Sequence, residues 1–202
     1  MPAWNRALFL LINASAHPPH AVVAVAKLFA SSPVVVVPLL LVILWVWGRR
    51  SARGGLLAAA VATIIALGIN VVLGAIYAEP RPFVIELGRT LIHHAADNAF
   101  PSDHATLVWA LAAGLFTTGA ARRWGLALAI YGLGVAWGRI FLGVHYPLDM
   151  IGSAVVAVVA GGIALVVRCW PVNWLLPAIE TLYERVIRAL RLPPALVPRA
   201  RG

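Results

Sequence analysis

Residues Leu148–Val167 read LDMIGSAVVAVVAGGIALVV, and after Asp149 this stretch contains no charged residue. As an α-helix it is long enough to cross roughly 30 Å of membrane hydrocarbon. Four more apolar runs precede it, so the sequence predicts an all-α fold, a polytopic membrane bundle of about five to six transmembrane helices. The earlier runs are Ala21–Trp47, Gly55–Tyr77, Ala105–Ala120 and Trp124–Leu142.

The composition excludes most other classes of protein. Of the 202 residues 62% are hydrophobic and 11% are charged, and the mean hydropathy is +0.91, far from the values of soluble domains. The net charge of +9 does not indicate a nucleic-acid partner, because the basic residues lie at the ends of apolar runs instead of forming one patch. The single cysteine, Cys169, excludes an intrachain disulfide.

The basic residues also predict the topology. They follow the first apolar run, separate the third run from the fourth, and follow the fifth. If the five helices alternate in direction, these three positions lie on the same side of the membrane. Positive charge marks the cytoplasmic side, so we expect the N-terminus outside, the C-terminus in the cytoplasm, and the connections 78–103 and 143–147 outside. The residues concerned are Arg49, Arg50, Arg53, Arg122, Arg123 and Arg168.

Three segments are expected along the chain. Residues 1–19 form an interfacial N-terminal segment with a helix over Trp4–Asn13. Residues 20–168 form the transmembrane domain, whose first run is interrupted at Pro33. Residues 169–202 form a cytoplasmic amphipathic helix and tail, because apolar residues recur at helical spacing from Ile179 to Leu190. The pair Gly134-x3-Gly138 favours close helix packing, inside the protein more often than between copies.

Three short polar clusters lie in the two outer connections or at the helix ends beside them. Ionisable groups near membrane segments are costly and therefore usually functional. Two arginines, two histidines, a helix-capping serine and an aspartate are suited to phosphoryl transfer without a metal. The clusters are Arg81-Pro82, Pro101-Ser102-Asp103-His104, and Arg139 with His145 and Asp149.

Within the last cluster, His145 is the candidate nucleophile. A neutral imidazole can attack phosphorus and form a phosphohistidine. Asp149 follows four residues later, across a helix start at Pro147, so its carboxylate can hold one ring nitrogen protonated and leave the other free. Taken alone, this pair would be interpreted as an interfacial histidine beside an unrelated helix-start aspartate. The other two clusters beside it favour the catalytic interpretation.

The other two clusters supply phosphate contacts. Arg81 and Arg139 carry permanently charged forks for phosphate oxygens, although Arg139 near a helix end also has a snorkelling interpretation. Ser102 is expected to cap the third helix, with the backbone N–H groups of 102–104 directed at an anion. His104 is then placed to protonate the leaving oxygen and later to activate water.

Additional polar residues have open roles. His94, Asp97 and Lys27 are candidates for substrate contacts, and Glu79 is either a substrate-sensing or an ordinary loop acid. His93, His94 and Asp97 could bind a metal, but adjacent histidines rarely direct both rings at one ion. We therefore expect no metal and no cofactor.

These motifs resemble the type 2 phosphatidic acid phosphatase superfamily, from about Leu40 to Val167. The stretch His94–Ala105, read with Gly138-Arg139-x5-His145-x3-Asp149, is similar to its bacterial undecaprenyl-diphosphate phosphatases of the bacitracin-resistance type. The resemblance implies a metal-independent phosphatase that uses the residues in the roles above.

The resemblance also implies a substrate and a location. They are undecaprenyl diphosphate, recycled to the monophosphate carrier lipid, and a multi-pass enzyme of the bacterial cytoplasmic (inner) membrane with an outward-facing active site. Alternatives are another lipid phosphate (phosphatidylglycerol phosphate, lipid A, phosphatidic acid), a lipid phosphotransferase, or a non-catalytic membrane protein. The lipid's chain length and the oligomeric state are left open.

The sequence departs from the superfamily pattern at three positions. Gly74 stands where a lysine is usual, seven residues before Arg81, and Lys27, Arg89 or a loop histidine are candidates to compensate for it. Asp103 stands where many members have glycine, and Gly138 where many have serine. These departures bear on the phosphate geometry more than on the type of reaction.

Overall fold

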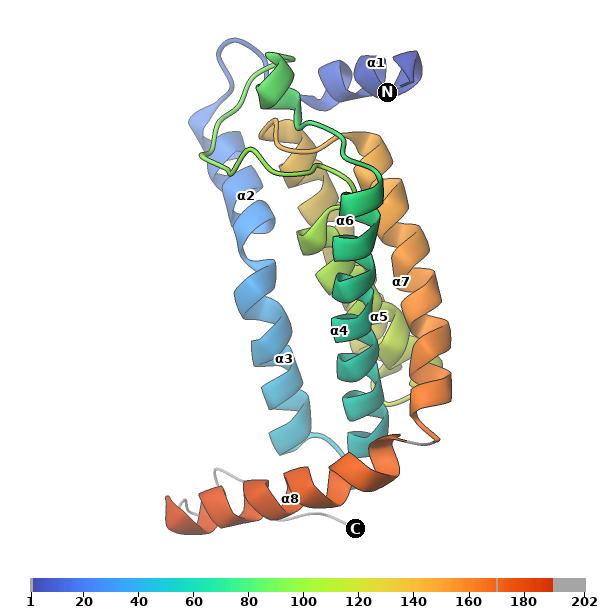
Figure 1. Ribbon diagram of the computed structural model, residues 1–202. Helices are drawn as coiled ribbons and strands as arrows, with labels where there is room; N and C mark the ends of the chain where they lie inside the picture. The colour runs from blue at the N-terminus through green and yellow to red at the C-terminus, as the bar shows by residue number, and fades with distance from the viewer. Residues whose placement is uncertain (1, 170, 191–202) are drawn as a thin grey trace.

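The computed structural model describes residues 2–169 and 171–190, and this part of the chain is helical throughout its regular elements (Figure 1). Each predicted apolar run corresponds to one helix, or to two in the case of the first run. The elements are α1 Ala3–Ile12, α2 His20–Ser31, α3 Pro33–Trp47, η1 Arg50–Ala52, α4 Arg53–Ile76, η2 Pro82–Ile85, α5 Asp103–Thr118, α6 Arg122–Phe141, α7 Pro147–Val167 and α8 Pro171–Ala189.

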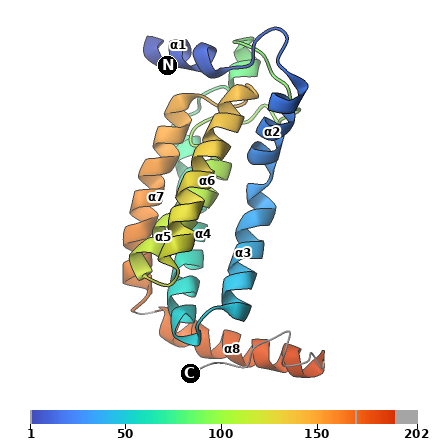
Figure 2. The same cartoon turned by 180° about the vertical axis from the view of Figure 1, so that it is seen from behind.

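Helix α5 is the centre of the bundle and packs against α4, α6 and α7 (Figure 2). Its side chains Leu111 and Leu115 are fully buried and join a core with Leu56 of α4 and Val135 of α6. The faces turned away from α5 are apolar as well, and Val71 and Val158 are 73% and 75% exposed. A surface of this kind is stable in lipid and not in water, which makes this a membrane protein.

By length and composition, three of the described helices can cross a membrane: Arg50–Ile76, α6 and α7. The pair α2 and α3 adds a fourth span if it is counted as one, and its two halves meet at a bend of 55°. Pro33 begins the second half, as the sequence suggested. Helix α5 has 16 residues, about 24 Å of helix. A count of five spans therefore depends on α5 and stays a prediction.

Two glycines of α6 allow α2 to approach closely. A side chain at Gly134 would meet the ring of Phe29, and one at Gly138 would lie 2.8 Å from the Ala26 carbonyl oxygen. The Gly-x3-Gly pair therefore serves packing within the chain, as expected. The contact also explains why glycine stands at 138, because a serine Cβ there would press against the backbone of α2.

Gly138→Ala is expected to destabilise the protein by about 1–3 kcal/mol, the usual cost of overpacking. The backbone of α2 cannot move aside as a flexible side chain would. The measurement is thermal unfolding in detergent. Gly162→Ala is the matched control, since a Cβ at Gly162 meets nothing within 4 Å and alanine favours the helix. Equal melting temperatures for the two variants would contradict this account of the α2–α6 contact.

The two ends of the bundle differ in character (Figure 1). One end carries α1 and the connections 77–102 and 142–146, while α8 lies across the other. Arg49, Arg50 and Arg168 lie together at the α8 end. The predicted clustering of basic residues at one end and catalytic motifs at the other is thus observed. The tail after residue 190 lies outside the described residues.

Candidate active site

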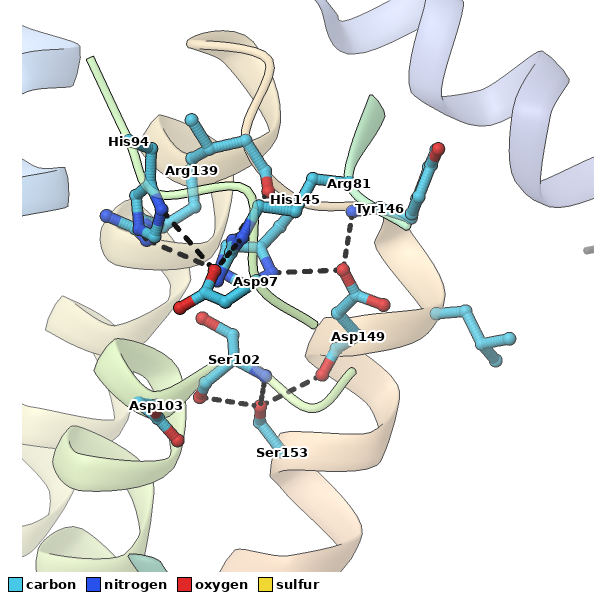
Figure 3. A network of polar contacts seen from close by, with 12 residues as sticks. Arg81, His94, Asp97, Ser102, Asp103, Arg139, His145, Tyr146, Asp149 and Ser153 are labelled. Atoms are coloured by element: carbon cyan, nitrogen blue, oxygen red, sulfur yellow. Dashed lines mark hydrogen bonds and ion pairs between the residues drawn. The ribbon is translucent and has the colours of Figure 1, made fainter. Parts of the chain in front are cut away.

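The three polar clusters meet at the α1 end of the bundle, where α5 and α7 begin and α6 ends (Figure 3). Arg81, Ser102, Arg139, His145 and Asp149 are each at most 5% exposed. Burying this many polar and charged groups together is unfavourable unless they pair with one another or with a ligand. The site is therefore a preorganised cluster of buried polar groups at the end of an apolar bundle.

The start of α7 fixes the geometry of His145 and Asp149. Tyr146 is the N-cap and Pro147 the first helical residue, which suits proline's fixed φ angle. Asp149 Oδ2 accepts hydrogen bonds from the Tyr146 backbone N–H at 2.8 Å and from His145 Nδ1 at 3.0 Å. The carboxylate thus closes the helix end and orients the imidazole with one and the same oxygen.

The neighbours of His145 determine its tautomer. Its Nε2 lies 3.0 Å from Arg81 Nη1 and 3.3 Å from Arg139 Nη2. A guanidinium can only donate, so Nε2 is the acceptor and the ring proton resides on Nδ1, facing Asp149. Burial, together with the charges of Arg139 and Arg81, lowers the pKa of His145 well below its usual range. The imidazole is therefore neutral at pH 7, with its lone pair directed at the two arginines.

Arg81 reaches the site from a short connection stiffened by prolines on both sides. Its Nη1 also donates to the Val144 carbonyl at 2.9 Å, and its Nε donates to Asp97 Oδ1 at 2.7 Å. The Asp97 side chain is 61% exposed, so an incoming phosphate can take its place. Arg81 is thereby aimed at the site with a displaceable carboxylate as its partner.

Arg139 lies in the last turn of α6, and its Nη2 donates to His94 Nε2 at 2.8 Å. The His94 ring also lies near that of His145, with centroids 6.4 Å apart. Arg139 Nε is buried and has no partner among the described residues. A buried donor of this kind is costly unless a ligand satisfies it. The snorkelling interpretation of Arg139 is wrong, because the guanidinium points into the site.

Ser102 occupies the N-cap position of α5, but the expected capping bond is absent from the described contacts. Its backbone N–H instead donates to Ser153 Oγ at 3.0 Å, so this N–H is not free for an anion. Its Oγ is buried without a partner among the described residues. The prediction of a side-chain cap was wrong because Ser153 of α7 orders this helix start, which leaves the Ser102 hydroxyl available for phosphate.

Ser102→Ala should lower kcat/KM roughly a hundredfold, the scale reported for removing one preorganised donor. Stability should hardly change, since the hydroxyl makes no bond within the described protein. Phosphate release and thermal unfolding measure the two effects. Ser51→Ala, an exposed serine at the α8 end, provides the control. A melting temperature that fell together with the activity would assign the hydroxyl a structural role.

His104 lies in the first turn of α5 and is half-buried. Beside it is a cavity of about 230 Å³ between α3, α4 and α5. His104 and Asp103 supply the polar part of its lining, and the rest is aliphatic. An apolar chain attached to a phosphate in the site would find a matching surface here. The aliphatic lining residues are Val34, Leu67, Val71 and Leu107.

The structure distinguishes among the residues that were candidates to replace the lysine for which Gly74 stands. Lys27 and Arg89 are exposed, and neither side chain joins the described hydrogen bonds of the site. His94 does join them, through Arg139. Gly74 itself faces Asn98, whose amide donates to the Gly74 carbonyl oxygen. Of the three candidates, only His94 contacts an arginine of the site.

In the loop that carries His93, His94 and Asp97, His94 Nδ1 lies 3.8 Å from Asp97 Oδ1, whereas the described contacts of the site do not include His93. His93 is exposed, while His94 contacts Arg139 and Asp97 contacts Arg81. Among residues 2–169 and 171–190, no group of three or more His, Cys, Asp or Glu side chains is placed to hold a metal ion. Glu79 is buried, and burial raises its pKa.

Sequence reasoning missed two positioning residues, Ser153 and Asn70. Ser153 Oγ lies 3.0 Å from the Ser102 carbonyl and 2.9 Å from that of Asp149, so it ties α5 to α7. Asn70 of α4 donates to Asp103 Oδ1 at 2.9 Å and to Thr106 Oγ1 at 3.0 Å. Each is a polar residue within an apolar run, and this is the sequence feature that could have identified it.

Comparison with known protein families identifies the family of this chain. Residues 55–174 match the PAP2 superfamily, a range that contains all three clusters. The chain belongs to the PAP2 superfamily. Two curated relatives cover most of both sequences. BcrC of Bacillus subtilis (strain 168), an undecaprenyl-diphosphatase, is 37% identical over 78% of this chain and 80% of its own. YbjG of Escherichia coli (strain K12) is 38% identical over 74% of this chain and 75% of its own.

A solved structure shares the fold of this chain. LpxE of Aquifex aeolicus is 26% identical, with a TM-score of 0.68 over 81% of this chain and 96% of that one. The likeness extends over the bundle and is not confined to the motifs. The PAP2 fold thus explains why residues from Arg81 to Asp149 converge at one end of α5.

Proposed function

We propose that this protein hydrolyses undecaprenyl diphosphate to undecaprenyl phosphate and inorganic phosphate through a phosphohistidine at His145. The observation that carries the proposal is the state of the His145 ring. Its Nδ1–H is held by Asp149 and its Nε2 lone pair lies between two guanidinium groups. This is a nucleophile already facing the charges that a phosphoryl group requires.

In the first step, His145 Nε2 attacks the terminal phosphorus of the diphosphate. The P–N bond forms as the bond to the bridging oxygen breaks, and undecaprenyl phosphate leaves. Arg81, Arg139 and the Ser102 hydroxyl hold the equatorial oxygens, where charge accumulates in the transition state. His104 donates a proton to the departing oxygen. Asp149 stabilises the positive charge that develops on the ring, as a buried carboxylate bonded to a histidine does.

In the second step, water cleaves the P–N bond. His104, left unprotonated, removes a proton from the water as its oxygen attacks the phosphorus. The electron pair returns to Nε2, and phosphate departs while His145 keeps its proton on Nδ1. Asp97 can then pair again with Arg81, as it does in this structure. The cycle closes with every residue in its starting protonation state.

The apolar cavity beside His104 supports a lipid as the leaving group. Its aliphatic walls include Val34 and Val71, which are 56% and 73% exposed on the outer surface of the bundle, where the tail of a membrane lipid would enter. The name of BcrC identifies that relative as an undecaprenyl-diphosphatase. In a bacterial cytoplasmic membrane with this end outward, the reaction would recycle the cell-wall carrier lipid and raise tolerance to bacitracin. We further propose residues 20–168 as the catalytic domain.

The test of the proposed reaction is phosphate release by purified protein in detergent with EDTA. Undecaprenyl diphosphate should be hydrolysed in EDTA, and faster than phosphatidylglycerol phosphate, lipid A or phosphatidic acid. Counting free phosphate against phosphorylated lipid separates hydrolysis from phosphotransfer. Loss of activity in EDTA, or a faster rate with one of the other lipids, would overturn the mechanism or the substrate respectively.

The orientation has its own test. In a Cys169→Ala background, cysteines introduced in place of Arg50 and Ala95 should be labelled by an impermeant thiol reagent from opposite sides of the membrane. Ala95 lies in the connection beside His94, whereas Arg50 lies at the α8 end. Labelling of Ala95→Cys in intact cells places the active site outside. Labelling of both from the same side would refute the proposed topology.

A further inference from the structure

A polar cavity lies at the opposite end of the bundle from the catalytic motifs. It has a volume of about 450 Å³ and is bounded by the α3–α4 turn, the α5–α6 turn, the end of α7 and the start of α8. Its lining includes the arginines Arg49, Arg50 and Arg168 and, on the α8 side, Val172 and Leu176. Basic groups thus meet an apolar edge where two spanning helices end.

The floor and one wall of this cavity are held rigidly. Arg53 is 6% exposed and donates to Glu180 of α8 at 3.1 Å. Its guanidinium also lies 5.0 Å from the ring centres of Trp45 and Tyr183. These contacts fasten α8 beneath α4 and keep the wall formed by Val172 in place. The cavity is therefore part of the folded end of the bundle and not a gap beside a loose helix.

The charges around the cavity are not balanced. Arg50 pairs with Glu180 and, more distantly, with Glu184. Arg168 donates to the Thr118 carbonyl at 3.1 Å, which leaves its charge uncompensated, and Arg49 has no carboxylate partner among the described residues. No acidic residue lines the cavity within the described chain. Two surplus guanidinium charges make it a site for an anion.

Its surroundings indicate which anion. Helix α4 begins and α7 ends at the cavity, so it lies at the level of lipid head groups. On α8, Trp174 is 81% exposed and Leu175 is 45% exposed, and exposed apolar residues of this type on a polar helix sit at the membrane interface. We propose that this cavity binds the phosphodiester head group of an anionic membrane phospholipid, with its acyl chains along the apolar end of α7.

The test measures lipid binding by the full chain in detergent, using native mass spectrometry with phosphatidylglycerol and phosphatidylcholine of equal chain length. The wild type should retain phosphatidylglycerol preferentially. Each arginine near an anionic head group contributes about fivefold, so Arg49→Gln with Arg168→Gln should weaken phosphatidylglycerol binding by roughly thirtyfold. Thermal unfolding without added lipid shows whether this double variant is folded.

Arg122→Gln with Arg123→Gln is the matched control, because these two exposed arginines begin α6 at the same end but do not line the cavity. It removes the same charge and should retain the wild-type affinity. Equal loss in both double variants would reduce the effect to general surface charge and overturn the proposal. Equal binding of phosphatidylcholine would also overturn the proposal. Displacement of the lipid by inorganic phosphate at similar concentrations would overturn it as well. Phosphate displacement would identify a soluble anion as the ligand.

Discussion

His145→Ala is expected to lower turnover by about 10⁴-fold or more, the scale on which a catalytic nucleophile acts. Alanine removes the Nε2 atom that faces Arg81 and Arg139, and no other described side chain offers a nucleophile at that point. Phosphate release from undecaprenyl diphosphate is the measurement. A second readout is covalent, because wild type quenched in alkali should carry a phosphoryl group on histidine and the variant should carry none.

The control for this prediction is His93→Ala. His93 belongs to the same end of the molecule but is exposed, so its removal should leave turnover within about twofold. His104→Ala should differ from both variants. Its phosphohistidine should accumulate, because the base that activates water in the second step is missing. Turnover by His145→Ala within tenfold of wild type would eliminate the covalent route altogether.

Arg139→Lys is expected to have the second large effect. It should lower kcat/KM by about 10²–10³-fold, although the substitution conserves the charge. The guanidinium reaches His94 and His145 with a single nitrogen and keeps Nε free and buried. A lysine ammonium is a point charge that cannot present two parallel donors to phosphate oxygens. The loss should appear mainly in kcat, because the fork is used most in the transition state.

Arg89→Lys makes the same substitution at an exposed arginine of the 77–102 connection and should leave both kinetic constants unchanged. Arg139→Lys could also act by disturbing the position of His94, so His94→Ala is needed beside it. If His94→Ala alone reproduced the full defect, Arg139 would be a positioning residue instead of a direct phosphate ligand. A kcat/KM for Arg139→Lys near the wild-type value would exclude both roles.

Much of the bundle was predictable from hydrophobic length and charge. The apolar runs located α4, α6 and α7 to within two residues at each end, because a span needs a minimum length and its ends need polar groups. The segregation of arginines at one end and motif residues at the other was predictable for the same reason. The spacing of His145 and Asp149 indicated their contact, since positions i and i+4 share a helix face.

What the sequence could not supply are contacts between helices distant in the chain. The hydrogen bond between Ser102 and Ser153 joins residues 51 positions apart in the sequence. Local capping preference therefore predicted that the Ser102 side chain caps α5, whereas Ser153 of α7 orders this helix start. The compensation at Gly74 depends on where the 82–102 connection folds back, and only the tertiary structure shows that His94 reaches Arg139 while Lys27 does not. Propensity and spacing carry no information about such pairings.

Helix α1 is attached to the catalytic turn by two contacts. Asn5 Oδ1 accepts the Leu148 N–H at 3.0 Å, and Phe9 packs edge-on against Tyr146 with ring centres 5.4 Å apart. Residues 1–19 were expected to be a separate interfacial segment, yet this part of them supports the turn that carries His145. A shortened version starting at α2 would keep every signature residue. It would nevertheless lose both contacts that support the turn carrying His145.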